Sequence, residues 1–567
     1  MAKRIIVVGG SAAGPKAACK TKREDPRAHV IMLQQSPELS MSSCAYPYHI
    51  RDGFDRSLLI GFPSGTIRDE EYFRTVKGVE AHVNAQVMSI DRARHEIEVL
   101  FKERGERRRM GYDKLVLATG ATPFMPPVPG IDLASVHSLW SMEDNDRIKR
   151  RIDEERPTAA VVIGGGLIGM EMVEALHAHG IKVTVVERAE HLFVFLDREM
   201  AAIVEQHVSR QGIEVITGNG LSEFEGHDGR VSAVKLADGR RLPCDFALVS
   251  VGVRPNSGLA QAAGLEIGRS GGVRVNEHLQ TSDPDIYAAG DCTEQPHRVL
   301  GDLRHLPLGD LANLQGRVVG KNVVHGNVAT YPGAFGTGAC EVFGMSLGAT
   351  GLWQEALEAQ SAGQCPPFET AIAAHADKLG VMGGQTIFVK LIAARETGKI
   401  LGMQAVGLGD AVKRVAITSA ALHGGLTVGD LVNFDLPYAP PFSPAFDPLI
   451  VAAHVLENKL EGKMRGMSAL AVQEHLESGA KPLLLDVRNP DEVAEERLGQ
   501  GELAIPLGEL RQRAGELPAD RATPIITYCR VSLRGYEAAV ILQALGYTRV
   551  TVMEGGLLAW TGPKITA

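Results

Sequence analysis

The chain has 567 residues, of which 44% are hydrophobic and 22% are charged. This length is too great for one hydrophobic core and predicts three or four domains, with the composition of an ordinary globular protein. The net charge of -9 argues against nucleic acid or an anionic membrane as the main partner, and no apolar run approaches the roughly 18 residues of a membrane span.

Seven cysteines are spread thinly along the chain, and none of them forms a CxxC pair. This pattern is typical of reduced thiols in a cytoplasm. The N-terminal MAKRIIVVGG leads at once into a strand-like run, without the length or cleavage site of a signal peptide. We therefore expect a cytoplasmic protein. No metal site is predicted, because the other cysteines have no ligand-like spacing: Cys19, Cys244, Cys292, Cys340 and Cys365.

The first candidate nucleotide site is a glycine turn near the N-terminus. A strand-like run leads into Gly9 and Gly14, and a helix and a second strand follow. Strand, glycine turn, helix and strand form the βαβ unit that binds a dinucleotide. Ser11 replaces the middle glycine, and Gln34 stands where an acidic residue belongs, so it can bond a ribose hydroxyl without charge. The expected contacts to this cofactor are Gly9, Ala13, Gly14 and Gln34.

The same pattern recurs further along the chain in a cleaner form. Gly164 permits the tight turn, Gly166 lets a pyrophosphate approach the backbone, and Gly169 lets the helix pack on the strand. Glu187 ends the next strand, where a carboxylate accepts the ribose 2′-hydroxyl and repels a 2′-phosphate, so NADH is favoured over NADPH. Arg188 beside it weakens this preference. The expected contacts are Gly164, Gly166, Ile168, Gly169 and Glu187.

Two further segments favour FAD at the first turn. The stretch 281–292 resembles a segment that returns the chain to the first nucleotide unit. Within it, Gly290 precedes Asp291, whose carboxylate can reach the ribityl and phosphate part of FAD. Another tight turn follows a strand at Ala118, Thr119 and Gly120.

Beyond residue 325 the glycine turns stop. Strand-like segments at 385–392 and 400–406, followed by a helix near 411–423, predict a separate α+β domain. The polar residues 457–466 predict a linker. The rest of the chain is predicted to form a small α/β unit with strands at 483–487 and 524–528.

The last of these strands ends at a loop that begins with Cys529 and holds Arg530 and Arg534. Backbone amides in such a loop, at the start of a helix, point inward, so they bind an anion and lower a thiol pKa. The loop therefore predicts a cradle for a charged sulfur. A second cysteine of interest, Cys44, lies near the first nucleotide unit, which suggests redox chemistry on sulfur-bound sulfur.

Residues 1 to about 455 resemble the pyridine nucleotide-disulfide oxidoreductase superfamily, in its single-cysteine branch of coenzyme A-disulfide reductases, NADH oxidases and NADH peroxidases. The glycine turns, the segment 40–48 around Cys44 and the segment 438–444 carry this resemblance. The C-terminal part resembles a rhodanese domain through 485–490, 505–507 and the Cys529 loop. The combination is similar to the fused coenzyme A-disulfide reductases, also called NADH-dependent persulfide reductases.

The resemblance implies an α/β fold with two Rossmann-like dinucleotide-binding domains, an α+β dimerisation domain and a C-terminal α/β rhodanese domain. It also implies a homodimer that uses FAD and NADH. The linker further predicts that residues 467–567 fold alone, since their core needs no contact from the flavin domains. The expected bounds are 1–115 and 255–325 for the FAD-binding domain, 116–254 for the NAD-binding domain, 326–456 for the dimerisation domain, 457–466 for the linker and 467–567 for the rhodanese domain.

The resemblance also implies the catalytic residues Cys44, Cys529 and Tyr438. Dithiol reductases of the superfamily carry a second cysteine shortly after the first, where this chain has His49. Cys44 must therefore cycle through a mixed disulfide, a persulfide or a sulfenic acid. Tyr438 is expected to act from the partner subunit and to protonate the leaving thiolate. Cys529 is expected to carry a persulfide, and the alternative is a rhodanese-like domain used for interaction only.

If coenzyme A is the sulfur carrier, its phosphates need cations. Lys16, Lys20 and Arg23 share one face of the first helix, which holds the coenzyme A nucleotide in coenzyme A-disulfide reductases, and Lys77 matches another of its contacts. A solvated basic face is the alternative, so whether coenzyme A binds stays open. The expected substrate contacts are Lys16, Lys20, Arg23, Ser40, Ser43, Lys77, Arg530 and Arg534.

Two departures from the family count against strict disulfide specificity. A Tyr-Tyr-Pro-Gly segment is replaced near 377–380, and Phe446 stands where the family has a lysine. We therefore predict an FAD-dependent, NADH-driven reductase that acts through Cys44 on the sulfane sulfur of a persulfide, a polysulfide, or a coenzyme A persulfide or disulfide.

Two alternatives to this function stay open. One is an NADH oxidase or peroxidase that uses a Cys44 sulfenate, and the other is a non-catalytic sulfur-carrier or redox-sensing module. Peroxidases of the branch carry a histidine in the first glycine turn, where this chain has Ala12, and the rhodanese domain favours a sulfur substrate.

Overall fold

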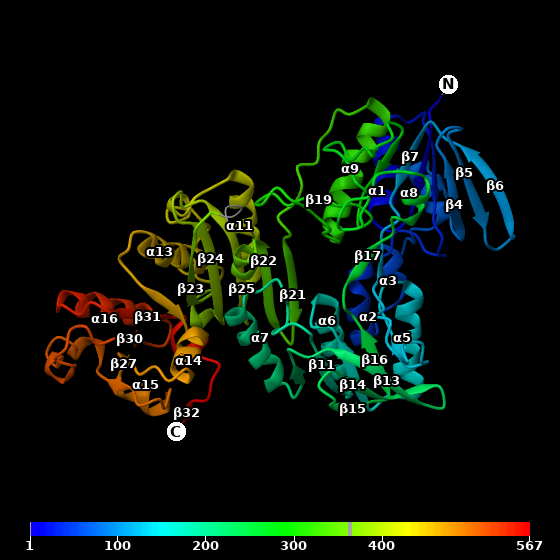
Figure 1. Cartoon of the computed structure of the whole chain (residues 1–567). Coiled ribbons are helices and arrows are strands. Elements are labelled where there is room, and N and C mark those ends of the chain that lie inside the picture. Colours follow the sequence, from blue (N-terminus) through cyan, green and yellow to red (C-terminus); the bar gives the residue numbers. More distant parts are fainter. Residues whose placement is uncertain (1, 361–365, 567) are drawn as a thin grey trace. The chain divides into compact units, whose positions relative to one another are not determined.

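The computed structural model describes residues 2–360 and 366–566, so Cys365 lies outside the described residues. The chain forms two compact units (Figure 1). The first reaches to Arg188 and includes Ile216–Ala334, and the second consists of Ala189–Val215 and the chain from Phe335 onward. None of the helices in the described ranges is long and apolar enough to cross a membrane.

A parallel five-stranded sheet is at the centre of the first unit, with the strand order β18-β7-β1-β2-β3. Its strands are β18 (Ile286–Ala288), β7 (Lys114–Leu117), β1 (Arg4–Val8), β2 (His29–Leu33) and β3 (Glu80–His82). Side chains alternate along a strand, so Ile5 and Val7 of β1 pack in a core with helices, and Ile6 and Val8 pack in a core with a second sheet. The apolar run of β1 is thus explained by burial on both faces.

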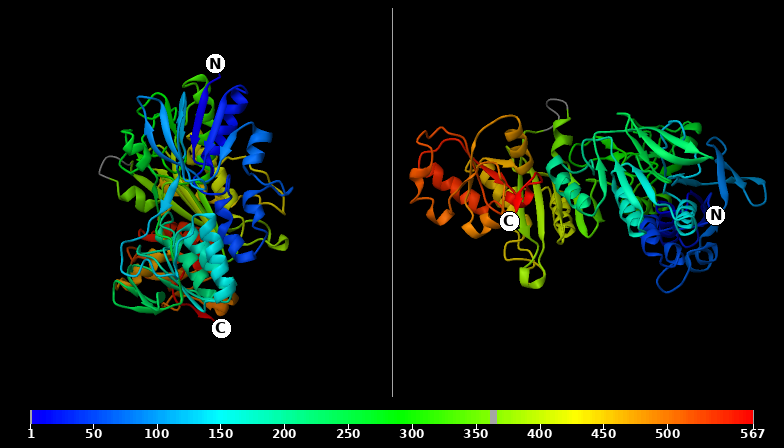
Figure 2. Two further views of the ribbon diagram at one scale, coloured as in Figure 1. Left: turned by 90° about the vertical axis from the view of Figure 1, so that its right-hand side faces the viewer. Right: turned by 90° about the horizontal axis from the view of Figure 1, so that it is seen from below.

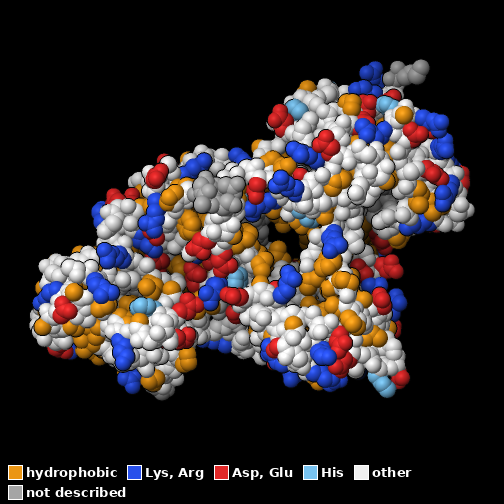
Figure 3. Space-filling view, viewed as in Figure 1, with side chains coloured by type: hydrophobic (Ala, Val, Ile, Leu, Met, Phe, Trp, Pro, Cys, Tyr) orange, Lys and Arg blue, Asp and Glu red, His pale blue; other side chains and the backbone are white. Residues whose placement is uncertain are grey.

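Helices α1 (Ala13–Glu24) and α9 (Gly309–His325) lie side by side over one face of this sheet (Figure 1). A Cβ on Gly316 would come within 2.6 Å of the Ala13 carbonyl oxygen, so glycine is needed for the two helix backbones to approach this closely. The other face is covered by the antiparallel sheet β4-β5-β6 (Ala85–Asp91, Glu96–Phe101, Glu106–Gly111). β6 contains three consecutive exposed arginines, and Figure 3 shows Lys and Arg side chains on this part of the surface.

The second glycine turn lies in a parallel sheet of the same design. β10 pairs with β11 on one side and with β16 on the other, β16 pairs with β9, and α6 follows the turn. The bounds are β9 (Val136–His137), β10 (Ala159–Ile163), α6 (Leu167–Ala178), β11 (Lys182–Val186) and β16 (Phe246–Val249). An antiparallel sheet, β13-β14-β15 (Leu221–His227, Arg230–Leu236, Arg241–Pro243), packs against these strands. The two βαβ units predicted from the sequence are confirmed.

The second unit contains an antiparallel sheet with the order β21-β22-β25-β24-β23. Its strands are β21 (Gly338–Val342), β22 (Met345–Gly351), β23 (Phe368–Ala376), β24 (Thr386–Ala394) and β25 (Ile400–Gly407), with α11 (Ala411–Gly424) and α13 (Pro448–Leu460) packed against it. The strands and the helix expected within 385–423 are confirmed.

Helix α7 (Arg198–Arg210) is attached to this antiparallel sheet through a buried charge cluster. The ammonium group of Lys390, on β24, is fully buried and lies 2.6 Å from a carboxylate oxygen of Asp197 and 2.6 Å from one of Glu199. The side chain of Gln404, on β25, donates to Asp197 at 2.8 Å. Since a buried ammonium needs such partners, the start of α7 is fixed on the sheet.

The C-terminal part, orange to red in Figure 2, is built on a parallel sheet with the order β26-β31-β30-β27-β29. Its elements are β26 (Gly466–Ser468), α14 (Ala469–Glu477), β27 (Leu483–Asp486), α15 (Pro490–Glu495), β29 (Leu503–Ala504), β30 (Ile525–Tyr528), α16 (Leu533–Ala544) and β31 (Val550–Glu554). The α/β unit and the two strands predicted from the sequence are confirmed.

Half of the residues 457–466, expected to be a linker, belong to regular elements, and 461–465 lie between them. Helix α13 continues to Leu460, and β26 begins at Gly466. Val455 and Met464 pack in the same hydrophobic core as the strands that follow. The chain therefore enters the C-terminal sheet directly from a helix of the preceding domain.

A buried salt bridge joins the same two parts. The carboxylate of Glu554, at the end of β31, lies 2.6 Å from the ammonium of Lys459 on α13, and it also accepts a hydrogen bond of 2.9 Å from the Ile372 amide on β23. Burial raises the pKa of Glu554, and Lys459 offsets part of that rise. This buried carboxylate therefore has partners outside 467–567, in α13 and β23 but not in the flavin domains, and independent folding of 467–567 stays a prediction.

Lys459→Met should lower the free energy of unfolding of the full chain by about 3 kcal/mol, because it leaves Glu554 buried without its counter-ion. The double variant Lys459→Met with Glu554→Gln should recover most of that loss, since no charge then stays unpaired. Urea unfolding measures both values. Lys463→Met is the control, because Lys463 pairs with Glu461 at the surface. Equal losses for the single and double variants would contradict the role of the pair.

Candidate active site

The first glycine turn is closed by contacts that only glycine permits. Gly9 has a φ of +114°, and a Cβ there would come within 2.0 Å of the Ala118 carbonyl oxygen. A Cβ on Gly14 would come within 1.8 Å of the Gly9 carbonyl oxygen. The turn therefore lies against the end of β7, and the first amides of α1 point away from its backbone with no acceptor within the helix. Such amides bind phosphate.

The residue at the end of the second strand holds the turn in both nucleotide units. The Gly10 amide donates to the Gln34 side-chain oxygen at 2.8 Å, and the Gly165 amide donates to a Glu187 carboxylate oxygen at 2.7 Å. Gln34 is only 8% exposed, and its amide group donates to Ser36. Gln34 and Glu187, the residues predicted to contact a ribose, are thus each already oriented by a hydrogen bond from a backbone amide.

The second turn repeats the geometry of the first. Gly164 has a φ of +109°, and a Cβ there would come within 2.2 Å of the Ser250 carbonyl oxygen. At Gly166, by contrast, a Cβ would meet nothing within 4 Å. This open space at the start of α6 is where a pyrophosphate can approach the backbone, and Ile168 lies in the first turn of that helix.

Cys44 and Asp291 come close together in the first unit, although they are far apart in the sequence. Cys44 is an exposed residue in the short helix η1 (Ser43–Ala45). Desolvation by the surrounding protein raises the pKa of its thiol, and the carboxylates of Glu171 and Asp291 raise it further. Burial likewise raises the pKa of Asp291. The protein alone therefore disfavours the Cys44 thiolate.

The helix that follows Cys44 in the chain, α2 (Tyr46–Asp52), is held on α6 by three polar contacts. The Tyr48 hydroxyl donates to Glu171 at 3.2 Å, Arg51 forms a 2.9 Å ion pair with Glu174, and the His179 ring contacts the Ile50 carbonyl oxygen at 2.7 Å. Glu171 and Glu174 lie one turn apart on α6. The second glycine turn and Cys44, both in the first unit, are thereby joined through two packed helices.

His49 is buried and takes the place of a second thiol. Its Nδ1 lies 3.1 Å from the Asn145 side-chain oxygen on α5 (Met142–Glu155). Since Cys44 has no neighbouring thiol among the described residues, it cannot form an internal disulfide there. Of the predicted pantetheine contacts, Ser43 is exposed, and Ser40 has a φ of +52° with its amide donating to the Gly10 carbonyl oxygen at 2.7 Å.

Three of the predicted coenzyme A cations gather around Cys19. Burial raises the pKa of that thiol, and the charges of Lys77, Arg23 and Lys16 oppose the rise. Lys20, one turn on from Lys16, instead forms an ion pair with Glu24, which also contacts His325. The helix face therefore offers three cations without a carboxylate partner among the described residues and one that is already neutralised.

The segments near Thr119 and Gly290, which are expected to contact FAD, are fixed by hydrogen bonds. Its hydroxyl donates to the Asn256 carbonyl oxygen at 2.7 Å, and the Asn256 side chain donates back to the Thr119 carbonyl oxygen at 2.9 Å. The Gly290 amide donates to the Gln315 side chain at 2.7 Å. Asp291 accepts no hydrogen bond at its carboxylate from any residue that the structure describes, so this half-buried acceptor is available to a ligand.

Tyr438 belongs to the second unit and is 58% exposed. The segment after it is fixed by a buried network in which Ser443 donates to Asp447 at 3.0 Å and Arg414, on α11, forms a 2.7 Å ion pair with the same carboxylate. The sequence indicated the segment but not its anchor, because Arg414 and Asp447 are distant in the chain.

Cys529 lies at the end of β30 and is only 1% exposed. The Leu557 amide donates to its carbonyl oxygen at 2.9 Å, which fixes the start of the loop. Ser532, just before α16, has a φ of +93°, a strained value for a residue with a side chain. Arg530 is exposed, whereas Arg534 is paired with a carboxylate that the sequence analysis missed, and its charge interacts with Cys529.

That carboxylate is Glu492, on α15. Its two oxygens each accept a 2.7 Å hydrogen bond from the Arg534 guanidinium, and this bond lowers the pKa of Glu492 to about 2. Asn489 and Glu492 form a capping box at the start of α15. The N-x-x-E spacing could have revealed the cap, but nothing in the sequence connects Glu492 with the cysteine loop.

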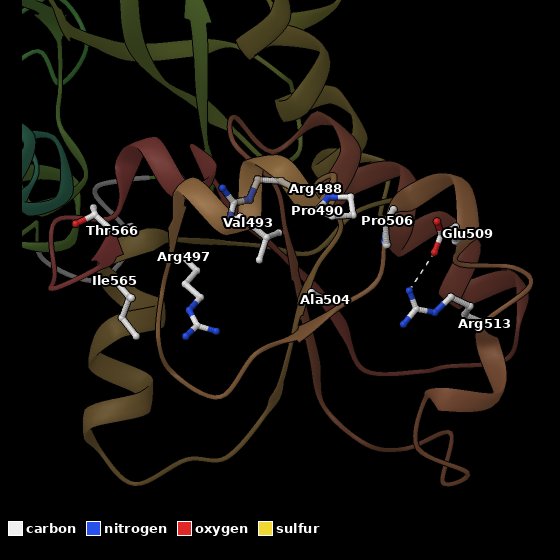
Figure 4. Close-up of a pocket in the computed structure, with 11 residues that line it drawn as sticks. Arg488, Pro490, Val493, Arg497, Ala504, Pro506, Glu509, Arg513, Ile565 and Thr566 are labelled. Carbon is white, nitrogen blue, oxygen red and sulfur yellow. Dashed lines mark hydrogen bonds and ion pairs between the residues drawn. The ribbon is translucent and has the colours of Figure 1, made fainter.

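A separate pocket of about 580 Å³ lies in the same domain (Figure 4). It is lined by the face of α15 at Val493, by Arg497 and by Pro506, and Arg513 points there toward Glu509. Cys529 does not line this pocket. No group of three or more potential metal ligands occurs in the described part of the chain.

Comparison with known proteins gives the family. A family model described as pyridine nucleotide-disulphide oxidoreductase matches residues 3–305, its dimerisation domain matches 338–450, and a rhodanese-like domain matches 468–563. The chain belongs to the pyridine nucleotide-disulphide oxidoreductase family. The matched ranges follow the two glycine-turn sheets, the antiparallel sheet and the C-terminal parallel sheet of the fold.

Solved structures similar to the whole chain include reduced CoADR-RHD from Bacillus anthracis, with 33% identity over 99% of this chain and 98% of that one, and a TM-score of 0.91. An NAD-dependent persulfide reductase from A. fulgidus has 35% identity over 98% of this chain and 100% of that one, with a TM-score of 0.92. An NADH oxidase from Methanocaldococcus jannaschii is 32% identical over 77% of this chain and 95% of its own length.

The family uses FAD and a nicotinamide nucleotide, and the residues present fit both groups. At the first turn, the amides of α1 suit a pyrophosphate, and the unpartnered carboxylate of Asp291 suits a hydroxyl. At the second turn, the open space at Gly166 suits a second pyrophosphate, with Glu187 at the end of the neighbouring strand.

Glu187 should make NADH the better donor, because its carboxylate repels a 2′-phosphate. Glu187→Gln should reduce the preference for NADH over NADPH roughly fivefold, the effect of about 1 kcal/mol for one nearby charge. The ratio of the two kcat/KM values measures it. Glu190→Gln, which removes an exposed charge three residues away, should leave the ratio unchanged. A higher kcat/KM for NADPH in the parent chain would contradict the assignment.

Glu171→Gln should lower the pKa of the Cys44 thiol in flavin-free chain, because it removes a negative charge beside the sulfur. A thiol whose pKa is raised stays protonated at neutral pH, so losing the carboxylate should speed alkylation of Cys44 by iodoacetamide at pH 7. Mass spectrometry of the Cys44 peptide measures the rate. Glu174→Gln, one turn further along α6, is the control, and equal rates in both variants would refute the effect.

Proposed function

We propose that the chain is an FAD-dependent, NADH-driven reductase of sulfane sulfur that acts through Cys44. The observation that carries this proposal is a lone thiol beside the nucleotide turns, with buried His49 where an internal disulfide partner would stand. A single thiol of this kind takes sulfur from a substrate instead of exchanging electrons with a second cysteine. The rhodanese domain of the same chain would also act on sulfur.

The overall reaction balances without another reactant. A persulfide RSSH, NADH and a proton give the thiol RSH, hydrogen sulfide and NAD⁺. FAD held at the first glycine turn would supply the transfer of an electron pair from NADH, and this pair would reduce the Cys44 persulfide to the Cys44 thiol and sulfide. The Cys44 thiolate attacks the outer sulfur of the substrate, the S–S bond breaks, and the inner sulfur leaves as a thiolate. A coenzyme A disulfide would follow the same course and give two thiols.

The chain's own residues orient the Cys44 thiol and influence its charge in this step. Helix α2 fixes the thiol through its contacts with α6. Because Glu171 and Asp291 disfavour the Cys44 thiolate, its charge needs a compensating group from the cofactor side of the site. Tyr438 of the partner subunit would protonate the leaving thiolate, since the dimerisation domain implies a homodimer. The proton would then return to Tyr438 from solvent, to which that residue is exposed.

Coenzyme A is proposed as a carrier of the sulfur. Lys16, Arg23 and Lys77 surround one site on α1 and can bind phosphates, while Lys20 would have to leave Glu24 to take part. Ser40 and Ser43 shortly precede Cys44 in the sequence and would contact the pantetheine arm. Cys529 would accept sulfane sulfur from a donor and hold it as a persulfide.

The alternative function is that of an NADH oxidase with a Cys44 sulfenate, as the name of the Methanocaldococcus jannaschii relative suggests. The rhodanese domain favours sulfur, because an oxidase has no use for a sulfur-accepting loop. NADH consumption with oxygen, polysulfide, coenzyme A disulfide and a persulfide, measured together with sulfide release, separates the two functions.

Cys44→Ser should bind FAD normally and retain less than about a tenth of the sulfur-dependent NADH turnover, a loss of at least about 1.4 kcal/mol in the barrier. A hydroxyl cannot form the persulfide. Cys19→Ser, which removes another thiol of the same unit, should keep the parent rate. Flavin absorbance checks cofactor binding in both. Turnover above that limit in Cys44→Ser would refute the proposed role.

A further inference from the structure

The charge around Cys529 differs from what the loop sequence indicates. The two arginines of the loop would give it two positive charges, suited to a dianion. Arg534, however, is held by both carboxylate oxygens of Glu492 at 2.7 Å, a forked geometry that is strong and specific. Glu492 stays ionised at neutral pH, because the bond to Arg534 lowers its pKa to about 2. Arg534 is therefore neutralised within the domain.

Arg530 is then the one cation of the loop with no carboxylate within ion-pair distance among the described residues. It is exposed, so its charge is screened by water. Arg488, the next guanidinium, is buried in its own pair with Asp486 at 2.6 Å. The loop therefore presents one solvated positive charge to a sulfur donor. Leu533, which is 65% exposed, adds an apolar side chain to the same loop.

Glu492 is linked to the Cys529 loop through Arg534, which belongs to that loop and is bound by both oxygens of the carboxylate. Because the charge of Arg534 interacts with Cys529, the carboxylate paired with it acts on the same site. A negative charge at this site repels an incoming anion, and the repulsion grows with the charge of the anion. Glu492 thus repels a doubly charged donor more strongly than a singly charged one, and it does not repel a neutral donor.

We propose that Glu492 determines the donor specificity of Cys529, selecting an organic persulfide over thiosulfate. This inference rests on the proposed role of Cys529 in sulfur transfer. With a persulfide, the Cys529 thiolate attacks the outer sulfur of RSSH, the S–S bond breaks, and Cys529–SSH and RS⁻ form. With thiosulfate, the same attack gives Cys529–SS⁻ and sulfite, and three negative charges come together as the bond forms. Glu492 is a positioning residue for Arg534 and a source of repulsion for the second reaction.

The test uses full-length chain carrying Cys44→Ser, without NADH, so that only Cys529 transfers sulfur. Thiosulfate and glutathione persulfide serve as donors and cyanide as acceptor, and thiocyanate formation gives kcat/KM for each donor. Glu492→Gln keeps the cap of α15, because glutamine also serves in a capping box. It should raise kcat/KM for thiosulfate about threefold to tenfold, as expected for one charge at a partly exposed site, and change the value for the persulfide less than about twofold.

Two matched variants serve as controls for the loss of charge and for the change in side-chain length. Glu495→Gln removes an exposed charge from the same helix and should leave the ratio of the two donors unchanged. Glu492→Asp keeps the charge with a shorter side chain and should retain the parent ratio. The proposal is overturned if Glu492→Gln leaves the ratio unchanged, if Glu495→Gln shifts it equally, or if Glu492→Asp shifts it as glutamine does.

A separate variant tests the proposed function on which this inference rests. Cys529→Ser should abolish transfer from both donors. If transfer persists in Cys529→Ser, the role of Cys529 fails, whatever the ratio in the Glu492 variants. If Cys529→Ser is inactive and the ratio does not respond to Glu492→Gln, only the specificity proposal fails.

Discussion

A hydrogen bond from a turn amide to the end of the neighbouring strand is the constraint on which both nucleotide sites depend. The glycine that follows β1 or β10 must turn sharply, which leaves the next amide without a backbone acceptor. Gln34 and Glu187 supply that acceptor. Because each turn is held in this way, α1 and α6 start at fixed positions and their first amides face the ligand. The contacts of α6 with α2 then fix Cys44, so a backbone requirement at one turn positions the reactive sulfur.

Buried ion pairs attach the elements of the second unit to its antiparallel sheet. Lys390 with Asp197, Arg414 with Asp447, and Lys459 with Glu554 each bury both charges. Replacing such a pair by apolar residues often costs little, whereas removing one partner is expensive. The pairs therefore contribute less to overall stability than to specificity, because a misplaced α7, Tyr438 segment or rhodanese domain would leave a charge buried alone.

The sequence predicted those features that repeat along one segment of chain. The glycine turns, the strand at 400–406 and the Cys529 loop are visible because their signals are local, in periodicity and in residue spacing. The buried partners of Lys459 and Arg534 were not predictable, since Glu554 and Glu492 are distant in the sequence and carboxylates are ordinarily on the surface. The polar composition of 457–466 misled for the same reason, because Lys459 looks solvated until Glu554 is known. Gln34 was expected to contact a ribose, which stays a prediction, and the structure shows its side-chain oxygen accepting a hydrogen bond from the Gly10 amide.

The two sulfur sites differ in how their charge is balanced, and this difference bears on how they would divide the work. Cys44 lies near two carboxylates, which oppose its ionisation, so under the proposed function its charge depends on a group that the chain must bind. The Cys529 loop balances its charge within its own domain, where the Arg534 guanidinium is paired with Glu492. Under the proposed function, Cys529 would therefore accept sulfur whether or not NADH is present, whereas Cys44 would depend on a bound flavin. Coupling sulfur release to NADH requires this asymmetry, because a Cys44 that ionised without the flavin would take up sulfur it could not reduce.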